Sequence, residues 1–225
     1  MLTLIIADAA LETVPKELRK HPSVKRSAAA REKRPEEILL DRSYHHAAML
    51  RLEEHYRRGR PDLVHIALLE AASTPLFLEK QLRVCVHTIG GKAIFLGEGV
   101  RLPRSYLRFI GLMEQLLKEG EVVSEGQRLL EVTDLTFKGL LSRVDASVTI
   151  GLSRTGKPSS FEAVADYLAS INNPVLVIGG FPRGHFTEAT AAHIDRTYSI
   201  SSLALEAHVV IARALYEYEK RVLKK

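Results

Sequence analysis

One stretch of the sequence limits the choice of fold more than any other. Residues 174–178, Pro-Val-Leu-Val-Ile, form an unbroken apolar run that is followed at once by Gly179 and Gly180. A run of this kind, without polar alternation, is typical of a strand that is buried on both faces. Such strands lie in parallel sheets that helices cover on both sides. The run therefore favours an α/β protein in which this strand ends at a tight turn.

Strand and helix patterns alternate along the rest of the chain. We expect strands over residues 2–7, 82–87, 93–96, 146–150 and 174–178, with the second and third forming a hairpin. We expect helices over residues 44–56, over 109–117 with a stop at Gly120, over 161–168, from about 186, and over 203–222. Residues 63–66 add a short apolar run. This alternation predicts an α/β fold with a mainly parallel sheet, in which ligands bind at the carboxyl ends of the strands.

The composition is that of one folding unit without membrane segments. A chain of 225 residues, of which 46% are hydrophobic, is long enough to bury a core. No apolar run approaches the roughly 18 to 20 residues that a membrane span needs, and residues 1–10 lack the basic start of a signal peptide. The single cysteine, Cys85, excludes an internal disulfide and a multi-cysteine zinc site. We therefore expect a cytoplasmic protein in which Cys85 is a buried apolar residue.

Basic residues gather in two places, although the formal net charge is only +5. Arg57, Arg58 and Arg60 precede a proline, and a longer basic stretch lies upstream of them. That stretch contains Lys16, Arg19, Lys20, Lys25, Arg26, Arg31, Lys33 and Arg34. Clusters like these bind polyphosphate partners by neutralising charge and releasing counterions. A solvated basic face explains the same pattern equally well.

The loop after the buried strand is a candidate ligand site. Residues 179–184, Gly-Gly-Phe-Pro-Arg-Gly and here called the glycine loop, lack side chains at positions where a ligand could approach the backbone closely. The alternative is that the glycines simply make a turn. The loop is neither a dinucleotide fingerprint nor a P-loop, which disfavours phosphate-nucleotide binding. The strand ends at residues 151–153 and near 198–203 are expected to lie at the same edge of the sheet.

A second group of residues is suited to RNA. Arg104 and Arg108 are four residues apart, so a helix projects them together, and Arg101 and Tyr106 lie beside them. Guanidinium groups match phosphate geometry and also stack on bases. The alternative is a structural role, in which these arginines pair with carboxylates such as Glu114.

Asp62 follows Arg60 by two residues and has two alternative roles. It either holds Arg60 through a charge-assisted hydrogen bond or acts as a base. Holding is favoured, because a carboxylate beside several arginines is stabilised in its charged form and accepts a proton poorly.

Other common site chemistries find no support in the sequence. The nine histidines show no metal-ligand spacing such as H-E-x-x-H, so we expect no metal site. Ser199, Ser201 and Ser202 have no neighbouring base that would mark a nucleophile, and we expect them to cap the last helix.

Six segments, spread over nearly the whole chain, carry a resemblance to a known family. They are residues 41–49 (DRSYHHAAM), 60–65 (RPDLVH), 100–109 (VRLPRSYLRF), 111–117 (GLMEQLL), the glycine loop and 201–205 (SSLAL). Together, and in this order, they resemble the archaeal and eukaryotic ribosome-biogenesis methyltransferases of the Nep/Emg family, which act on N1 of a pseudouridine in small-subunit ribosomal RNA.

The resemblance implies a SPOUT-type α/β fold whose C-terminal segment is threaded into a trefoil knot, with a mainly parallel sheet and a family-specific insertion. It implies one methyltransferase domain over residues 1–225, whose knotted, cofactor-binding part covers about 145–225. It also implies a homodimer, and S-adenosyl-L-methionine as the cofactor.

The matching motifs imply site residues of two kinds. The cofactor positions are Leu152, Gly179, Gly184, Tyr198, Ser199, Ile200, Ser201, Ser202 and Leu203. The third loop departs from the pattern of eukaryotic members, which is close to S-N-Y-P-L-S, because this chain reads Ser-Ser-Leu-Ala-Leu-Glu there. The positions that match rRNA-contacting arginines are Arg60, Arg101, Arg104 and Arg108, here called the arginine surface, and Asp62 matches a residue that orients Arg60.

The implied reaction is methylation of N1 of a pseudouridine in 16S rRNA, with a role in small-subunit biogenesis. The enzyme would supply mainly alignment and desolvation to a flipped base. No catalytic residue is assigned, and Asp62 is the one candidate base. Two alternatives stay open: an rRNA-binding assembly factor without catalysis, and a SPOUT enzyme that acts on tRNA, against which the ordered arginine motifs argue. Ribosomal proteins are further expected partners.

Overall fold

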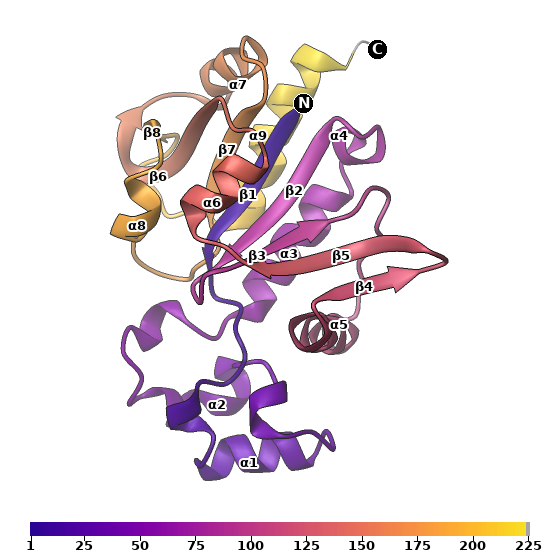
Figure 1. Cartoon of the computed structure of the whole chain (residues 1–225). Coiled ribbons are helices and arrows are strands. Elements are labelled where there is room, and N and C mark those ends of the chain that lie inside the picture. The colour runs from indigo at the N-terminus through magenta and orange to yellow at the C-terminus, as the bar shows by residue number, and fades with distance from the viewer. Residues whose placement is uncertain (224–225) are drawn as a thin grey trace.

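In the computed structural model, which describes residues 1–223, β1 (Leu2–Ala9) lies near the middle of a sheet of eight strands (Figure 1). The strand order is β4-β5-β3-β2-β1-β7-β6-β8. The other strands are β2 (Leu82–Thr88), β3 (Lys92–Leu96), β4 (Glu121–Ser124), β5 (Gln127–Asp134), β6 (Val148–Pro158), β7 (Pro174–Gly179) and β8 (Arg196–Ser199). β1 is buried from end to end, as its central place requires.

Nine α-helices and three short 3-10 helices connect the strands within the described residues. The α-helices are α1 (Pro22–Ala29), α2 (Arg42–Met49), α3 (Pro61–Ala72), α4 (Pro75–Leu78), α5 (Tyr106–Glu119), α6 (Phe137–Arg143), α7 (Phe161–Ala169), α8 (Glu188–Ala191) and α9 (Ala207–Val222). The 3-10 helices are Lys16–Leu18, Pro35–Glu37 and His55–Arg57. The segment between β1 and α3, with α1 and α2, packs round its own apolar cluster at one end of the sheet (Figure 1).

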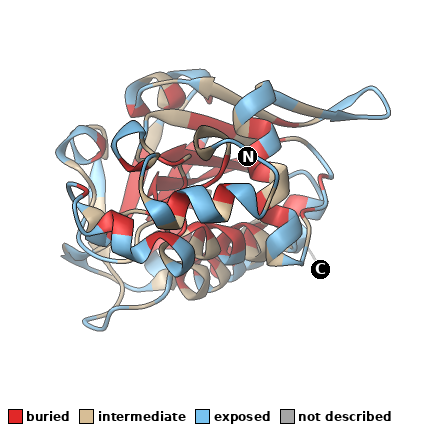
Figure 2. Cartoon of the chain, turned by 90° about the horizontal axis from the view of Figure 1, so that it is seen from below, coloured by how far each residue is buried: buried red, intermediate tan, exposed pale blue. Residues whose placement is uncertain are grey.

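Side chains of β1 alternate between two hydrophobic layers, as the two-residue period of a strand dictates. Leu2, Leu4 and Ile6 pack into the larger layer, to which α3, α5, α7 and α9 contribute. Ile5 and Ala7 pack into the smaller layer, with α6. Burial is accordingly concentrated in the strands and on the inner faces of the helices (Figure 2). The sheet thus has a covered core on each face.

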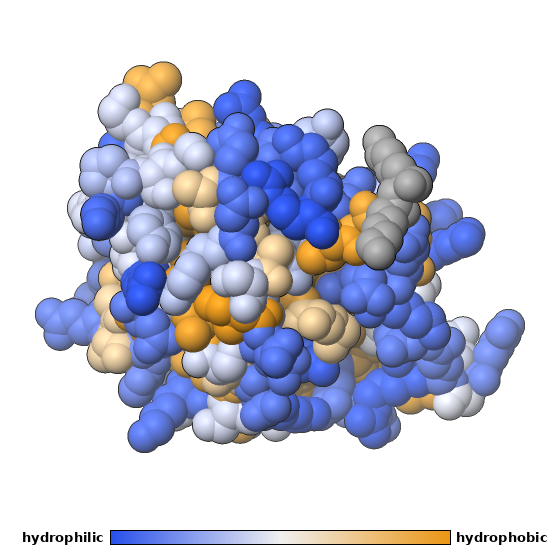
Figure 3. Space-filling model, turned by 90° about the horizontal axis from the view of Figure 1, so that it is seen from above, coloured by the Kyte–Doolittle hydropathy of each residue, from blue (hydrophilic) through white to orange (hydrophobic). Residues whose placement is uncertain are grey.

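The sheet divides into a parallel half and an antiparallel half. β2, β1, β7, β6 and β8 run parallel, whereas β3, β5 and β4 are joined to β2 by antiparallel pairs. The carboxyl ends of the parallel strands therefore share one edge. The opposite end, where β1 begins, is mostly hydrophilic, with a limited apolar area near its middle (Figure 3). No helix within residues 1–223 is both long and apolar enough to cross a membrane.

The predicted α/β fold with a mainly parallel sheet is confirmed, since four of the seven strand pairs are parallel. The strands expected over 2–7, 82–87, 93–96 and 174–178 are present, and 82–87 and 93–96 form the expected hairpin. The helices expected over 109–117 and 161–168 are α5 and α7, and α5 ends at Glu119 with Gly120 as its C-cap. The expected strand at 146–150 is β6, which starts at Val148 and runs on to Pro158 because it pairs with β8 a second time.

Two predictions of helix were wrong in their bounds. The helix expected over 44–56 ends at Met49, because Leu52 turns back into the apolar cluster that holds Met49. The last helix begins at Ala207 rather than at 203. The short helix expected from about 186 is α8, which begins at Glu188. The apolar run 63–66, in contrast, is part of α3, whose first helical position is Pro61.

Candidate functional site

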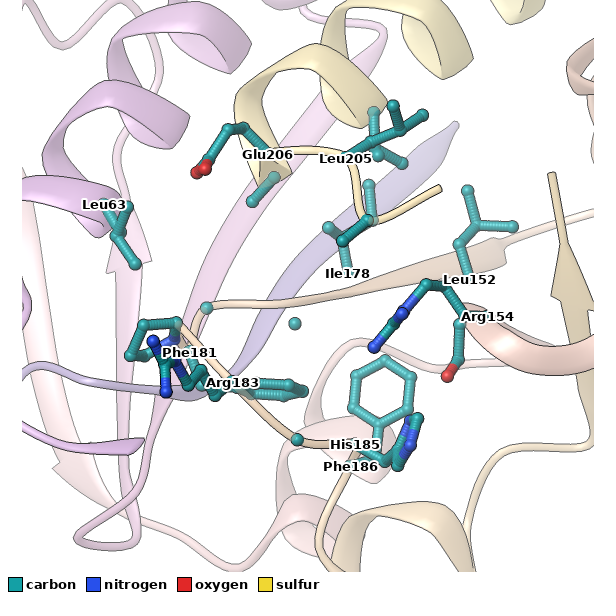
Figure 4. A pocket seen from close by; sticks show the side chains of 18 of the residues that line it. Leu63, Leu152, Arg154, Ile178, Phe181, Arg183, His185, Phe186, Leu205 and Glu206 are labelled. Atoms are coloured by element: carbon teal, nitrogen blue, oxygen red, sulfur yellow. The ribbon is translucent and has the colours of Figure 1, made fainter. Parts of the chain in front are cut away.

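A cavity of about 530 Å³ lies at the carboxyl end of β7 and beside the middle of β6, where the register of β6 against β8 shifts between Leu152 and Lys157. Three segments surround it, here called its three loops: residues 152–154 in the irregular part of β6, residues 178–186 from the end of β7 onward, and residues 200–207, which lead into α9. Leu63 of α3 (Figure 4) completes the wall together with Val210 of α9. This three-loop pocket stands where the parallel sheet was expected to collect a ligand, and its volume suits a small organic molecule.

The glycine loop is fixed to the end of β1 by its own backbone. The N–H of Gly180 donates to the carbonyl of Ala7, and the carbonyl of Gly180 accepts from the N–H of Ala10, both at 2.8 Å. A Cβ atom at Gly180 would stand 2.7 Å from the side chain of Ile6 and 2.9 Å from the backbone of Ala9. Only glycine therefore fits this close approach of the two segments.

The pocket wall is mostly apolar and carries a few charged groups. Figure 4 shows Glu206 and Leu205 on the α9 side and Phe181 and Phe186 on the opposite side. The charged side chains on the wall are Arg154, Arg183 and Glu206, and the polar ones are Ser153, His185 and Ser201. An apolar pocket with a few polar groups at fixed places is the usual form of a site for a small molecule.

Six of the nine predicted cofactor positions line the three-loop pocket: Leu152, Gly179, Gly184, Ile200, Ser201 and Leu203. Tyr198, Ser199 and Ser202 do not. Tyr198 pairs in β8 with Leu152 and again with Lys157, so its backbone holds the first loop closed. The hydroxyl of Ser199 donates to the carbonyl of Ser201.

The prediction that the serines cap the last helix was wrong. The residue that precedes α9 as its N-cap is Glu206, and its side chain makes no capping hydrogen bond. The hydroxyl of Ser201 instead accepts a hydrogen bond from the N–H of Leu203 at 3.0 Å. The serines therefore shape the third loop rather than the helix.

Several residues of the pocket wall were not among the predicted site residues. Arg183 lies within the glycine loop, which the sequence marked as a candidate ligand site. Arg154 and His185 directly follow residues 151–153 and the glycine loop, so their position was an available signal. Leu63 and Glu206 gave no signal, because their place depends on how α3 and α9 pack against each other.

Arg60 and Asp62 form the predicted contact beside this pocket. Nε of Arg60 donates to one carboxylate oxygen of Asp62 at 2.8 Å, and Nη2 donates to the other at 2.7 Å. This hydrogen bond is the main cause of the raised pKa of Arg60. Because Leu63, the next residue, lines the pocket, the pair lies close to its rim.

The segment with Arg101, Arg104 and Arg108 is anchored to its surroundings by other side chains. A ring nitrogen of His65 lies 2.7 Å from the carbonyl of Pro103, and the hydroxyl of Tyr106 donates to Asp41 at 2.6 Å. Burial first, and then Asp41, raise the pKa of the Tyr106 phenol.

The three arginines of this segment are themselves exposed and make no ion pair among the described residues. The alternative in which Glu114 neutralises them is wrong. Glu114 is buried and accepts from Arg31 at 3.0 Å, Lys33 at 2.7 Å and the N–H of Leu39 at 2.9 Å.

The two basic clusters are partly used inside the protein. Arg58 forms an ion pair with Glu12, and Arg57 is buried. Arg31 and Lys33 hold Glu114, whereas Lys16, Lys20, Lys25 and Arg26 are exposed. The exposed basic residues of this stretch that make no ion pair among the described residues therefore lie in α1 and before it, whereas Arg34, also exposed, pairs with Glu36 and Glu37.

The described residues contain no arrangement of side chains suited to metal binding or to nucleophilic catalysis by cysteine. Among residues 1–223 no group of three or more His, Cys, Asp or Glu side chains could hold a metal ion. Cys85 is buried, as expected, and burial raises the pKa of its thiol to about 12, which makes it a poor nucleophile.

Comparisons with known proteins agree on one family. The model of the EMG1/NEP1 methyltransferase family matches residues 4–219. The chain is similar to the ribosomal RNA small subunit methyltransferase Nep1 of Thermococcus onnurineus, with 38% identity over 99% of this chain and 100% of that protein. It is 40% identical to the protein of the same name from Pyrococcus furiosus, over 99% of this chain and 98% of the other. The crystal structure of Archaeoglobus fulgidus Nep1 bound to S-adenosylhomocysteine matches with a TM-score of 0.87 and 36% identity, over 97% of both chains.

Proposed function

Because the chain belongs to the EMG1/NEP1 methyltransferase family, we propose that it transfers a methyl group from S-adenosylmethionine to N1 of a pseudouridine in small-subunit ribosomal RNA. The modified RNA would be 16S rRNA, and the reaction would belong to the biogenesis of the small subunit. The relatives are named as small-subunit rRNA methyltransferases. That the target base is a pseudouridine and the target atom N1 is our proposal.

One observation carries the proposal. The three-loop pocket lies at the strand ends of a chain that matches an S-adenosylhomocysteine-bound relative along 97% of its length. The pocket fits such a ligand chemically. Its apolar side chains suit an adenine ring, while Arg154, Arg183 and Glu206 offer partners of both signs for a carboxylate and an ammonium group.

The residues of the pocket would bind and shield the cofactor. Gly179 and Gly184 present backbone, Leu152 closes the floor, and Ile200, Ser201 and Leu203 form the third wall. Tyr198, Ser199 and Ser202 would act indirectly, through the shape of the first and third loops. When bound, S-adenosylmethionine supplies the methyl group. The protein would contribute alignment and the exclusion of water.

The arginine surface would hold the RNA. Arg101, Arg104 and Arg108 are free of internal carboxylates among the described residues, so their charge is available to phosphates. Asp62 would orient Arg60 rather than act as a base, because both of its oxygens accept hydrogen bonds from that guanidinium. A guanidinium group that is held in one orientation in this way favours one geometry of contact with a phosphate or a base.

The decisive experiment compares two RNAs that differ in one base. The purified protein and methyl-labelled S-adenosylmethionine are incubated with a small-subunit rRNA hairpin that contains pseudouridine, or with the same hairpin containing uridine. We expect label only in the pseudouridine RNA, and nucleoside mass spectrometry should place the methyl group on N1. Label in both RNAs would contradict the pseudouridine assignment.

The two alternatives have their own outcomes in this experiment. Binding of rRNA without binding of S-adenosylmethionine in calorimetry would favour the assembly factor. Label in a tRNA transcript but not in the rRNA hairpin would favour a tRNA enzyme. Homodimerisation, a cytoplasmic location, contacts with ribosomal proteins, the knotted threading and the cofactor-binding part at about 145–225 stay predictions from the family resemblance.

A further inference from the structure

Two buried side chains from distant segments hold the glycine loop and the residues that follow it from outside the pocket. Arg57 lies in the 3-10 helix before α3 and Asp8 at the end of β1. They are only 6% and 3% exposed, and neither lines the three-loop pocket. Arg57, which the sequence grouped with Arg58 and Arg60 as a phosphate contact, is therefore not available to RNA.

Arg57 touches the loop at two points. Its Nη2 donates to the carbonyl of His185 at 2.8 Å, directly after the loop. The centre of its guanidinium lies 4.8 Å from the centroid of the Phe181 ring, within cation–π range. Phe181 in turn packs edge-on against Phe186, and both rings line the pocket. One side chain thus fixes an aromatic ring and the backbone on which the pocket wall depends.

Asp8 ties the start of α8, which follows the glycine loop, to Arg57. Its carboxylate accepts from the N–H of Thr187 at 2.7 Å and from the hydroxyl of Thr190 at 2.7 Å. It lies 3.6 Å from Nη2 of Arg57, close enough to compensate the buried charge. Asp8 itself has left-handed backbone, with φ of 49°, a conformation that persists only where its surroundings hold it.

The structure assigns Arg57 and Asp8 the role of positioning residues that hold the glycine loop in its ligand-binding shape. This inference rests on the proposed function, since it takes the three-loop pocket to be the S-adenosylmethionine site. The physical reason is preorganisation: a loop that binds through backbone and ring edges loses affinity when it must be ordered by its ligand. Two residues outside the C-terminal third would then determine cofactor affinity without touching the cofactor.

Three variants test the role in the full-length protein. Arg57→Met removes the positive charge and the planar guanidinium group but keeps an unbranched apolar side chain. Arg57→Lys keeps the charge but cannot serve both partners with one planar group. Thr190→Val removes one hydroxyl donor to Asp8 at nearly constant size. Arg143→Met is the matched control, because Arg143 also lies over an aromatic ring, Phe95 at 4.1 Å, and donates to a carboxylate, Glu131 at 2.6 Å, but is not part of the pocket.

The first readout is the affinity for S-adenosylhomocysteine in calorimetry. Arg57→Met should weaken binding on the order of tenfold or more, and Thr190→Val roughly two- to fivefold. Arg57→Lys should lie between Arg57→Met and wild type, and Arg143→Met should stay within about twofold of wild type. At saturating RNA, KM for S-adenosylmethionine should rise while kcat changes little, a split that a general loss of folded protein would not produce.

The outcomes separate this inference from the proposed function. Wild-type protein that fails to bind S-adenosylhomocysteine would remove both. If wild type binds, and folded Arg57→Met and Thr190→Val bind equally well, the positioning role is wrong while the function stands. Should Arg57→Met not fold, Thr190→Val alone decides, since the loss of one hydroxyl leaves the ion pair in place.

Discussion

One residue of the glycine loop, Gly184, has a backbone conformation that residues other than glycine adopt only under strain. Gly184 has φ of 99°, and a Cβ added there would meet nothing closer than 3.9 Å. The difficulty for another residue is therefore conformational and not steric crowding. A β-branched residue at such a position costs on the order of 1–3 kcal/mol, which the loop avoids by changing shape.

Gly184→Val should accordingly abolish binding of S-adenosylmethionine while the protein stays folded. Calorimetry with S-adenosylhomocysteine measures the first effect, and thermal unfolding measures the second. Gly91→Val is the control, because Gly91 also has positive φ, 75°, with nothing within 4 Å, but lies in the hairpin between β2 and β3. Normal cofactor binding by Gly184→Val would remove the glycine loop from the site.

The Arg60–Asp62 pair gives a second prediction at this scale. Arg60→Ala and Asp62→Ala should each weaken RNA binding by about tenfold, the worth of one charge-assisted contact. If Asp62 only orients Arg60, the double variant should bind about as well as either single one. Binding is measured by fluorescence anisotropy with the pseudouridine hairpin. Additive losses would instead give Asp62 a role of its own, and Arg128→Ala, in the exposed pair with Glu121, serves as the control.

Contacts between side chains could be predicted from residue types and spacing only where the two partners are close in sequence. The Arg60–Asp62 contact spans two positions, and its geometry follows from the motif. Glu114 was assigned to the wrong arginines, because its partners Arg31 and Lys33 are about 80 residues away in sequence. Such pairs are decided by tertiary packing, which periodicity does not encode.

At the scale of elements, one buried carboxylate on α5 joins this helix to the segment between β1 and α3. Glu114→Gln should lower the free energy of unfolding by about 2 kcal/mol, because the amide cannot accept from Arg31, Lys33 and the N–H of Leu39 together. Urea unfolding measures the loss. Glu119→Gln, on the exposed part of the same helix, should change the stability by less than about 0.5 kcal/mol; equal losses in both variants would refute the special role of Glu114.

Strongly patterned elements were predictable and weakly patterned ones were not. β7 and α7 have clear apolar periods, and the structure contains both. β4 is mostly exposed, so its residues carry no burial pattern, and it was missed. The end of α2 at Met49 depends on Leu52 filling a neighbouring cluster, which is a property of the tertiary structure. The same reason explains why the pocket wall from α3 and α9 was not foreseen.

At the scale of the whole molecule, buried histidines link stability to pH. His45 is fully buried, and burial is the main cause that lowers its pKa below 6.5. At a pH between this lowered pKa and 6.5, His45 is protonated in the unfolded chain but not in the folded protein. The free energy of unfolding therefore falls as pH falls through this window. We expect the melting temperature to drop below about pH 6.5, and His45→Asn, whose amide oxygen replaces Nδ1 as acceptor for the N–H of Asp41, to flatten this slope.

The control for this pH effect is the neighbouring residue. His46 is exposed, so His46→Asn should leave the slope of melting temperature against pH as in wild type. A slope that is unchanged in His45→Asn would show that other groups, such as His87, whose pKa burial also lowers, account for the loss.

The two proposed surfaces should respond to different changes. Arg104→Glu should weaken RNA binding more than Arg104→Ala, because it adds repulsion to the loss of a contact, and the neutral variant should reduce the slope of log affinity against log salt by about 1. Affinity for S-adenosylhomocysteine should hardly change. RNA binding at two salt concentrations and cofactor calorimetry together test this. Normal RNA binding with loss of the cofactor would mean that Arg104 belongs to the other surface.

The central place of β1 also has a consequence for how the protein is made. Thr3 pairs with Val175, about 170 residues later, whereas its other neighbour, β2, is only about 80 residues away. At a synthesis rate of roughly 5–20 residues per second, the gap between these two events lasts several seconds or more. During that time one side of the first strand has no native partner and is open to strands of other nascent chains. The pace of translation should therefore influence how much of the protein reaches its native state.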